Sequence, residues 1–178
     1  MQRLFVAIEI PQDVRARMAG LCAGLPGARW VAPENMHLTL RFIGEVDEGV
    51  MQDVDAELAR LRAPGFALTF SGVDCFGNAR RPRSLWVGVE AGEALAGLQA
   101  RVESAVQRAG LPPEGRNFTP HVTLARFKGG RVARLGDYLS AHSQFRAGPV
   151  DVRRITLFSS VLGHSGAIYR PEAAYPLD

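Results

Sequence analysis

Two short motifs in the chain carry the same pair of polar side chains two residues apart. They are His37-Leu38-Thr39-Leu40 and His121-Val122-Thr123-Leu124. The chain has only four His and five Thr, so random placement would give about 0.1 His-x-Thr occurrences. Residues two apart on a β-strand share a face, so each His and its Thr should point to one side while the apolar residues point to a core. We therefore interpret the two motifs as parts of one site.

Two imidazoles and two hydroxyls suit the cleavage of a phosphodiester by in-line displacement. One neutral imidazole takes the proton of the attacking oxygen, and one charged imidazole protonates the departing oxygen. Imidazole is the side chain whose ordinary pKa allows both forms near neutral pH. The hydroxyls of Thr39 and Thr123 can donate hydrogen bonds to the non-bridging phosphate oxygens, where negative charge accumulates. The motifs alone do not decide which His is the acid.

A zinc site is the main chemical alternative, because His is a common zinc ligand. Zinc sites generally use at least three protein ligands. No Asp, Glu or Cys lies near either motif at ligand spacing. A single His-x-Thr would also fit an ordinary surface or core position, but two in matching places favour a site. We expect neither a metal nor another cofactor.

Apolar periodicity predicts four helices and at least seven strands. Pro11 should open the first helix, and Asp47 should cap the second. A loop rich in Gly, Arg and Pro is expected at 77–83. We expect helices at 11–25, 47–61, 95–109 and 131–141, strands at 3–10, 36–43, 66–71, 85–90 and 118–127, and two or three more strands within 149–176.

The same order of elements occurs twice, which indicates an internal duplication. Leu4–Glu9 resembles Leu85–Glu90 at an offset of 81, and the two His-x-Thr motifs repeat at an offset of 84. Leu68–Ser71 weakly resembles Thr156–Ser159. We expect halves of about 1–80 and 81–178 that interleave within a single domain, 1–178. A pseudo-two-fold arrangement of these halves would bring both His-Thr pairs to one cleft.

The composition is that of an ordinary globular protein. A chain of 178 residues with 47% hydrophobic and 22% charged residues is long enough for one domain or two lobes around a shared core. It has no apolar run near the roughly 20 residues of a membrane span and no signal-peptide pattern, so we expect a cytoplasmic protein. Twenty of its 21 basic residues are Arg, which binds phosphate in a bidentate manner.

The residues around both motifs resemble a known family. Trp30–Gly44 and Phe118–Arg126 resemble the two signatures of the 2H phosphoesterases, and more narrowly of the RNA 2′,3′-cyclic phosphodiesterase branch, also called the 2′-5′ RNA ligase family. Arg3–Glu9, Arg81–Trp86 and Gly166–Tyr169 resemble the same branch. The resemblance implies an α+β, bilobal fold of two mainly antiparallel sheets with flanking helices and a central cleft.

The resemblance also implies an activity, which is hydrolysis of RNA 2′,3′-cyclic phosphate ends to 2′-phosphates. His37 would be the proton donor to the departing 3′ oxygen, and His121 would be the base that activates water. Thr39 and Thr123 would bind the phosphate. The expected partner is RNA with such an end, either tRNA fragments or oligonucleotides, and no membrane. We expect a monomer, because a duplicated cleft needs no partner chain.

Further arginines are candidates for substrate binding. The resemblance implies that Arg126 binds phosphate, but strict alternation turns it away from Thr123, so a bulge or a strand end is required. Strict alternation along the strand would put Arg41 on the same side as His37 and Thr39. It could equally be a solvated strand residue. Arg81 and Arg83 lie in a polar loop that could follow an RNA backbone or be ordinary surface charge.

Four aromatic residues could stack on a base or pack in the core instead. We expect Phe42 and Tyr169 to be the substrate-binding candidates among them, with Phe5 and Phe76 as the others.

Two other functions fit the same residues. The first is 2′-5′ ligation, in which an RNA 5′-hydroxyl replaces water; hydrolysis should prevail because water is at about 55 M and the competing RNA end is dilute. The second is a non-catalytic RNA-binding module. Such a module would need a strand of exposed stacking aromatics, and the sequence contains no such run.

Overall fold

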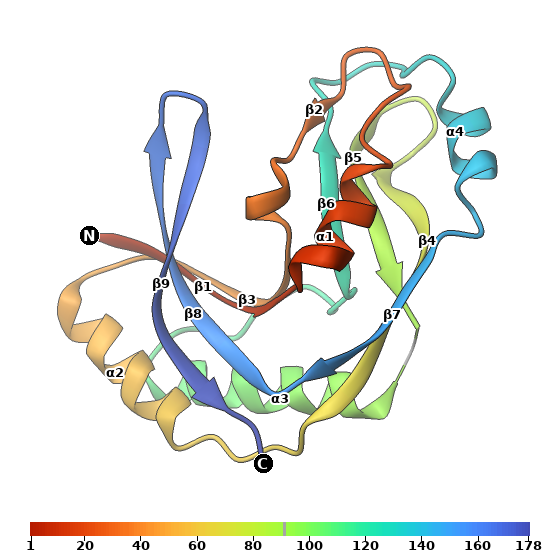
Figure 1. The fold of residues 1–178 in the computed structure, drawn as a ribbon. Helices are drawn as coiled ribbons and strands as arrows, with labels where there is room; N and C mark the ends of the chain where they lie inside the picture. Colours follow the sequence, from red (N-terminus) through yellow and green to blue (C-terminus); the bar gives the residue numbers. More distant parts are fainter. Residues whose placement is uncertain (91) are drawn as a thin grey trace.

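A computed structural model describes residues 1–90 and 92–178 of the chain (Figure 1). Within them it contains four α-helices, one short 3-10 helix and nine strands. In chain order these are β1 (Gln2–Glu9), α1 (Gln12–Ala19), β2 (Arg29–Trp30), η1 (Pro33–Asn35), β3 (His37–Val46), α2 (Glu48–Ala59), β4 (Phe66–Gly77), β5 (Pro82–Val89), α3 (Glu93–Arg108), β6 (His121–Arg126), α4 (Leu135–Ala141), β7 (Arg146–Val152), β8 (Arg154–Gly163) and β9 (Gly166–Pro176).

The strands form two antiparallel sheets. Sheet A has the order β3-β1-β8-β9, and sheet B has the order β2-β6-β5-β4-β7. The trios β3-β1-β8 and β6-β5-β4 follow the same plan, and in each the third strand comes from the other half of the chain. The expected α+β fold of two antiparallel sheets with duplicated halves is therefore confirmed.

Apolar faces of the helices cover the sheets. Helix α3 buries Leu95, Leu98, Val102 and Val106 at the spacing of one helix face, and it contacts β3 and β4. Helix α2 packs against α3 along the lower edge of the molecule (Figure 1). The expected Asp47 cap is confirmed, because its carboxylate accepts a hydrogen bond of 2.8 Å from the Val50 backbone N–H. No helix in the described residues is long and apolar enough to cross a membrane.

Two helices are shorter than the periodicity predicted. Helix α1 ends at Ala19 instead of continuing to residue 25, and Pro11 is its N-cap instead of its first residue. The apolar pattern misled here because Leu21 and Leu25 are buried although they lie in the irregular segment after the helix. Helix α4 begins at Leu135 instead of residue 131, after several turn residues.

Strand ends also differ from the prediction. Strand β3 does not stop at Gly44 but continues to Val46, and β4 runs past residue 71 to Gly77. The pairs Leu4–Gly44 and Phe5–Phe42 leave one extra residue in β3, and Gly44 has a φ of 88° that favours glycine at this bulge. Strand β6 begins at His121 instead of residue 118.

Candidate active site

The two His-x-Thr motifs begin the two strands at the junction of the sheets. His37 is the first residue of β3 and His121 is the first residue of β6, and these strands contact each other across the junction. Both histidines and both threonines are half-buried, whereas the intervening Leu38 and Val122 are fully buried. The alternation expected from the sequence is therefore observed in both motifs.

Each imidazole is oriented by a backbone carbonyl two residues earlier in the chain. Nδ1 of His37 lies 3.0 Å from the Asn35 carbonyl oxygen, and Nδ1 of His121 lies 2.6 Å from the Thr119 carbonyl oxygen. Because a carbonyl only accepts, Nδ1 of each ring carries a hydrogen. Nε2 of each ring is then the nitrogen that exchanges a proton with a bound molecule.

Each motif ends in a β-bulge at the equivalent place. Relative to its partner strand, β3 has Leu40 as an extra residue and β6 has Leu124. The bulge reverses the alternation, so that exposed Arg126 returns to the side of Thr123, as the sequence analysis required. Phe42 occupies the equivalent position in β3, with 59% of its surface exposed.

The bulge turns Arg41 away from this side. Arg41 is only 8% exposed, and its Nε donates to Glu103 Oε2 at 2.6 Å. Its other guanidinium nitrogens donate to the carbonyl oxygens of Phe42 and Pro112 and to Glu103 Oε1. Arg41 thus connects β3 to α3, and we leave it out of the proposed substrate-binding residues.

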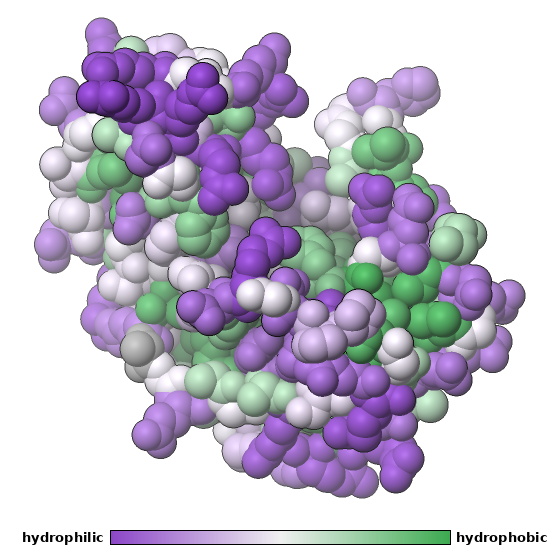
Figure 2. Space-filling view, turned by 180° about the vertical axis from the view of Figure 1, so that it is seen from behind, coloured by the Kyte–Doolittle hydropathy of each residue, from purple (hydrophilic) through white to green (hydrophobic). Residues whose placement is uncertain are grey.

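Aromatic side chains line the site on the side of sheet A. Phe5 stacks on Phe158 with ring centroids 5.2 Å apart and meets the edge of Tyr169 at 5.0 Å. The His37 ring lies 4.6 Å from Phe158, and Phe42 lies 5.9 Å from Phe5. Phe5 itself is buried, so Phe42 and Tyr169 are the members that a ligand can reach. Figure 2 shows hydrophobic residues gathered around the base of the β8–β9 hairpin, beside the notch that separates it from the lobe of sheet B.

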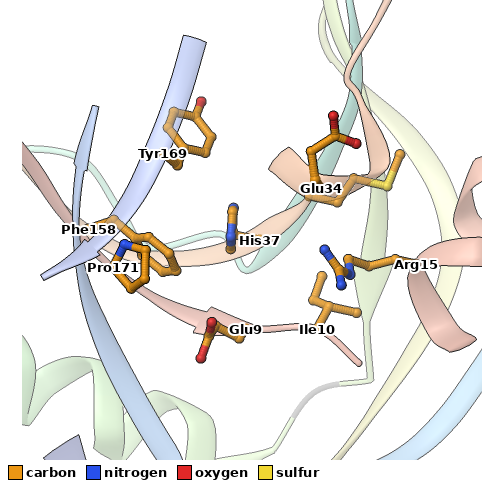
Figure 3. A pocket seen from close by; sticks show the side chains of 9 residues that line it. Glu9, Ile10, Arg15, Glu34, His37, Phe158, Tyr169 and Pro171 are labelled. Atoms are coloured by element: carbon orange, nitrogen blue, oxygen red, sulfur yellow. The ribbon is translucent and has the colours of Figure 1, made fainter. Parts of the chain in front are cut away.

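A cavity of about 200 Å³ lies directly beside His37 (Figure 3). We call it the His37 pocket; it is lined by Glu9, Ile10, Arg15, Glu34, Met36, His37, Phe158, Tyr169 and Pro171. Arg15 of α1 points into it, and its buried Nε has no hydrogen-bond partner within the described residues. Glu9 accepts hydrogen bonds from Arg154 and Thr156 at 3.0 and 3.2 Å.

Neither Glu9 nor Arg15 belongs to a motif that marks it as a site residue in the sequence. Glu9 was detectable only through strand register, because it pairs with His37 across β1 and β3. In the other half, Gly88 pairs with His121. The strands therefore match at an offset of 79, not at the 81 suggested by sequence similarity. The residue paired with the histidine is a carboxylate in the first half and a glycine in the second.

The side of sheet B has different neighbours. The His121 ring lies 4.8 Å from Phe76 and 5.8 Å from Trp86, whose Nε1 is buried without a partner in the described part of the chain. A second, larger cavity of about 650 Å³ lies at the same end of the sheet as Arg126. It is lined by Gly77, Asn78, Arg81, Pro82, Arg83, Phe127, Lys128 and Gly129, and we call it the basic pocket.

The two histidines differ in electrostatic surroundings. Burial lowers the pKa of His37, the hydrogen bond with Asn35 and the charge of Glu9 act to raise that pKa, and Arg15 lowers it. Burial also lowers the pKa of His121, the hydrogen bond with Thr119 acts to raise that pKa, and Arg126 lowers it. A negative group thus acts on His37 but not on His121. Among residues 1–90 and 92–178, no group of three or more His, Cys, Asp and Glu side chains could hold a metal ion.

Comparison with known proteins agrees with this arrangement. A sequence model of the family described as LigT like Phosphoesterase matches twice in succession, over residues 8–86 and 87–169. The chain therefore belongs to the LigT-like phosphoesterases, a family of 2H phosphoesterases.

Curated relatives and solved structures are similar over nearly the whole length. An RNA 2′,3′-cyclic phosphodiesterase of Aeropyrum pernix is 40% identical over 83% of this chain and 84% of that protein. One of Aquifex aeolicus is 32% identical over 92% of this chain and 85% of its own. The crystal structure of E. coli LigT complexed with 3′-AMP has a TM-score of 0.81 and 28% identity, over 99% of this chain and 98% of that one.

Proposed function

We propose that this chain, acting as a single 2H phosphoesterase domain over 1–178, hydrolyses RNA 2′,3′-cyclic phosphate ends to 2′-phosphates. One observation carries the proposal: two imidazoles, each oriented by a carbonyl at Nδ1, begin the contacting strands of two sheets, each with a Thr on the same side. The names of the similar proteins support the class of substrate.

The proposed reaction needs only residues of this chain. Nε2 of His121 takes a proton from water, the water oxygen bonds to phosphorus, and the bond from phosphorus to the 3′ oxygen breaks. His37 gives its proton to that oxygen, which leaves a 2′-phosphate and a 3′-hydroxyl. Thr39 and Thr123 donate hydrogen bonds to the non-bridging oxygens, and Arg126 balances their charge.

The surroundings of the histidines support this order. Burial lowers the pKa of both histidines, and only at His37, the residue that must be protonated before the reaction, does a nearby carboxylate, that of Glu9, act against this lowering among the described residues. A base must be neutral, and the positive charge of Arg126 favours neutral His121. The order itself is the one that the family resemblance implies, and one neighbouring charge of each histidine supports it.

The order also assigns the nucleoside to one side of the site. The departing 3′ oxygen belongs to the terminal ribose, so this nucleoside lies beside His37. We propose that it occupies the His37 pocket, with Tyr169 and exposed Phe42 in contact with the base. Nε of Arg15, which has no hydrogen-bond partner among residues 1–90 and 92–178, is a donor for the same nucleoside.

Product identification tests the proposal. A short RNA with a 2′,3′-cyclic phosphate is incubated with the protein, and the product is compared with synthetic 2′- and 3′-phosphate standards. The expected product is the 2′-phosphate alone, formed equally well after treatment with EDTA. A 3′-phosphate would contradict the assigned leaving oxygen, and loss of activity with EDTA that zinc restores would favour a metal site.

The proposal extends to the oligomeric state, the substrate and the location. One chain supplies both His-Thr pairs, which supports a monomer. The substrates we propose are tRNA fragments or other oligonucleotides with cyclic ends, and these place the enzyme in the cytoplasm.

A further inference from the structure

Asn35 forms two hydrogen bonds with different parts of the site, one through its backbone and one through its side chain. Its carbonyl oxygen lies 3.0 Å from Nδ1 of His37 and orients that ring. Nδ2 of its side chain donates to the carbonyl oxygen of Ala167 in β9, at a distance of 2.9 Å. Asn35 and Ala167 are 132 residues apart in sequence, so this one residue connects the His37 ring to a distant part of the chain.

The β8–β9 hairpin extends beyond the strands that pair with it. It rises above sheet A, with η1 beside it (Figure 1). Strand β1 pairs with β8 only as far as Ser160, so the residues between Ser160 and Tyr169 pair within the hairpin alone. Strand β9 lies at the edge of its sheet, and η1 contacts it. The side chain of Asn35 thus anchors the hairpin on its open edge.

The segment that carries Asn35 has little support of its own. Helix η1 spans three residues, none of which is buried, and only the next residue, Met36, is in the core. Hydrogen bonds in a 3-10 helix are also less well aligned than those in an α-helix. An asparagine side chain has only two rotatable bonds, so holding its amide on Ala167 restricts the backbone of the same residue. The hairpin therefore limits where the Asn35 carbonyl, and with it the His37 ring, can lie.

Tyr169 completes a ring of contacts around this anchor. It is two residues from Ala167 in β9, and alternation along the strand puts both on the same side. The Tyr169 ring lies 5.6 Å from the imidazole of His37. In the proposed reaction, Tyr169 contacts the base of the terminal nucleoside, and His37 protonates the 3′ oxygen of the same nucleoside. Both groups that act on this nucleoside are therefore tied to one hairpin.

The second motif differs at the corresponding residue. Thr119 lies two residues before His121, and its carbonyl contacts Nδ1 of that ring. Its side chain is exposed and takes part in none of the hydrogen bonds of the described residues. The difference suits the two proposed roles. A small water molecule can adjust its position to the base, whereas the 3′ oxygen of a bound nucleoside lies at one place, so the acid requires the more exact placement.

We propose that Asn35 is a positioning residue that holds His37, the proposed proton donor, in place from the β8–β9 hairpin. The proton donor and the nucleoside-binding Tyr169 then move as one unit. The inference rests on the proposed function, because it requires His37 to deliver a proton to the bound nucleoside. Asn35 itself does not line the His37 pocket and acts only through the ring that it orients.

Two substitutions remove the side-chain donor of Asn35 and leave its backbone carbonyl in place. Asn35→Leu nearly keeps the size of the side chain, and Asn35→Ala shortens it. Asn117→Ala is the matched control, because Asn117 is an exposed asparagine four residues before His121 whose side chain makes no hydrogen bond within the described residues. Circular dichroism and thermal melting verify that all three variants are folded.

Two measurements are made on each variant. The first is kcat and KM for a nucleoside 2′,3′-cyclic phosphate. The second is the tautomer of each of the two histidines, read from long-range ¹H–¹⁵N NMR spectra at a pH where both rings are neutral. The tautomer reports the contact between Nδ1 and the carbonyl directly, because this contact favours the form with its hydrogen on Nδ1.

We expect both Asn35 variants to lower kcat about tenfold, with a smaller rise in KM, because the proton donor is less exactly placed. Part of the neutral His37 population should change to the form with its hydrogen on Nε2, since the Asn35 carbonyl is no longer held against Nδ1. The tautomer of His121 should stay unchanged in the same spectra, which makes it an internal reference. Asn117→Ala should match the wild type in both measurements.

Other outcomes separate this inference from the proposed function. A rise in KM with normal kcat would overturn the inference and leave Asn35 as a support for nucleoside binding alone. A lower kcat with an unchanged His37 tautomer, or equal changes in both rings, would also overturn it and indicate general loosening of the fold. Because the NMR measurement needs no turnover, it decides the anchor of His37 even if the wild type hydrolyses no cyclic phosphate, a result that would refute the proposed function itself.

Discussion

At the scale of single residues, two nearly identical motifs acquire different chemistry from their neighbours. The carbonyl contacts at Nδ1 are the same for both histidines. The differences are Glu9, which pairs with His37 where Gly88 pairs with His121, and the opposite charge of Arg126. An acid and a base can thus arise from a duplicated motif through one strand partner and through one residue after the bulge, which is Arg126 in β6 and Phe42 in β3.

Removing either imidazole tests the two-histidine mechanism. We expect His37→Ala and His121→Ala each to lower kcat by at least about a hundredfold, because each loses one proton-transfer group. His142→Ala is a suitable control, since this third imidazole packs on Tyr138, outside the lining of both pockets. The assay is turnover of a nucleoside 2′,3′-cyclic phosphate. Near-normal turnover by His37→Ala would refute the assignment of the acid.

The pH profile tests the charged neighbours. Glu9 raises the pKa of His37, so Glu9→Gln should lower that pKa and move the alkaline limb, where the acid loses its proton, to lower pH. Arg126 lowers the pKa of His121, so Arg126→Gln should raise that pKa and move the acidic limb to higher pH. The limbs are read from kcat/KM as apparent pKa values of the coupled pair.

Glu45→Gln is the control for the pH experiment, because its exposed carboxylate pairs with Arg3 and does not line the His37 pocket. If Glu9→Gln instead moves the acidic limb to lower pH and Arg126→Gln moves the alkaline limb to higher pH, His37 is the base and His121 the acid.

At the scale of elements, the sequence predicted the strands of the site but not their irregularities. The alternation within each motif is local, so the sides of His37 and Thr39 could be predicted. The bulge at Leu40 depends on pairing with β1, which is distant in the chain, and no local pattern reveals it. For this reason simple alternation put Arg41 on the wrong side of the strand. A bulge before Arg126 could be anticipated only because Arg126 was expected to bind phosphate.

The ion pair of buried Arg41 and half-buried Glu103 gives a stability prediction. Arg41→Met leaves Glu103 without its cation and the carbonyls of Phe42 and Pro112 without a donor, so we expect the free energy of unfolding to fall by about 2 kcal/mol. Arg41→Met with Glu103→Met should recover part of the loss, because no lone charge remains. Urea unfolding measures both, and kcat/KM of folded Arg41→Met should stay near normal. Intact stability with lost activity would return Arg41 to the substrate-binding residues.

At the scale of the whole molecule, duplication could be predicted from the repeated motifs, but the exchange of strands could not. The family model matches each half in turn, yet each sheet takes its third strand from the other half. Two apolar strands that alternate in the same way can be aligned equally well after a shift of two residues. Sequence similarity therefore could not distinguish an offset of 81 from one of 79, and the hydrogen-bonded pairing of the strands shows that it is 79. The order of the halves in sequence therefore does not describe the units that fold.

Exchange of the third strands predicts that neither half folds alone. In a fragment of residues 1–80, β1 lacks β8, and β4 lacks both β5 and β7. Its exposed edges and uncovered apolar faces should prevent cooperative unfolding in urea, and the same holds for residues 81–178. Co-expressed fragments should associate and regain a cooperative transition and hydrolytic activity, because both sheets and both His-Thr pairs are then restored. Cooperative unfolding of either fragment alone would contradict a single interleaved domain and leave two independent lobes.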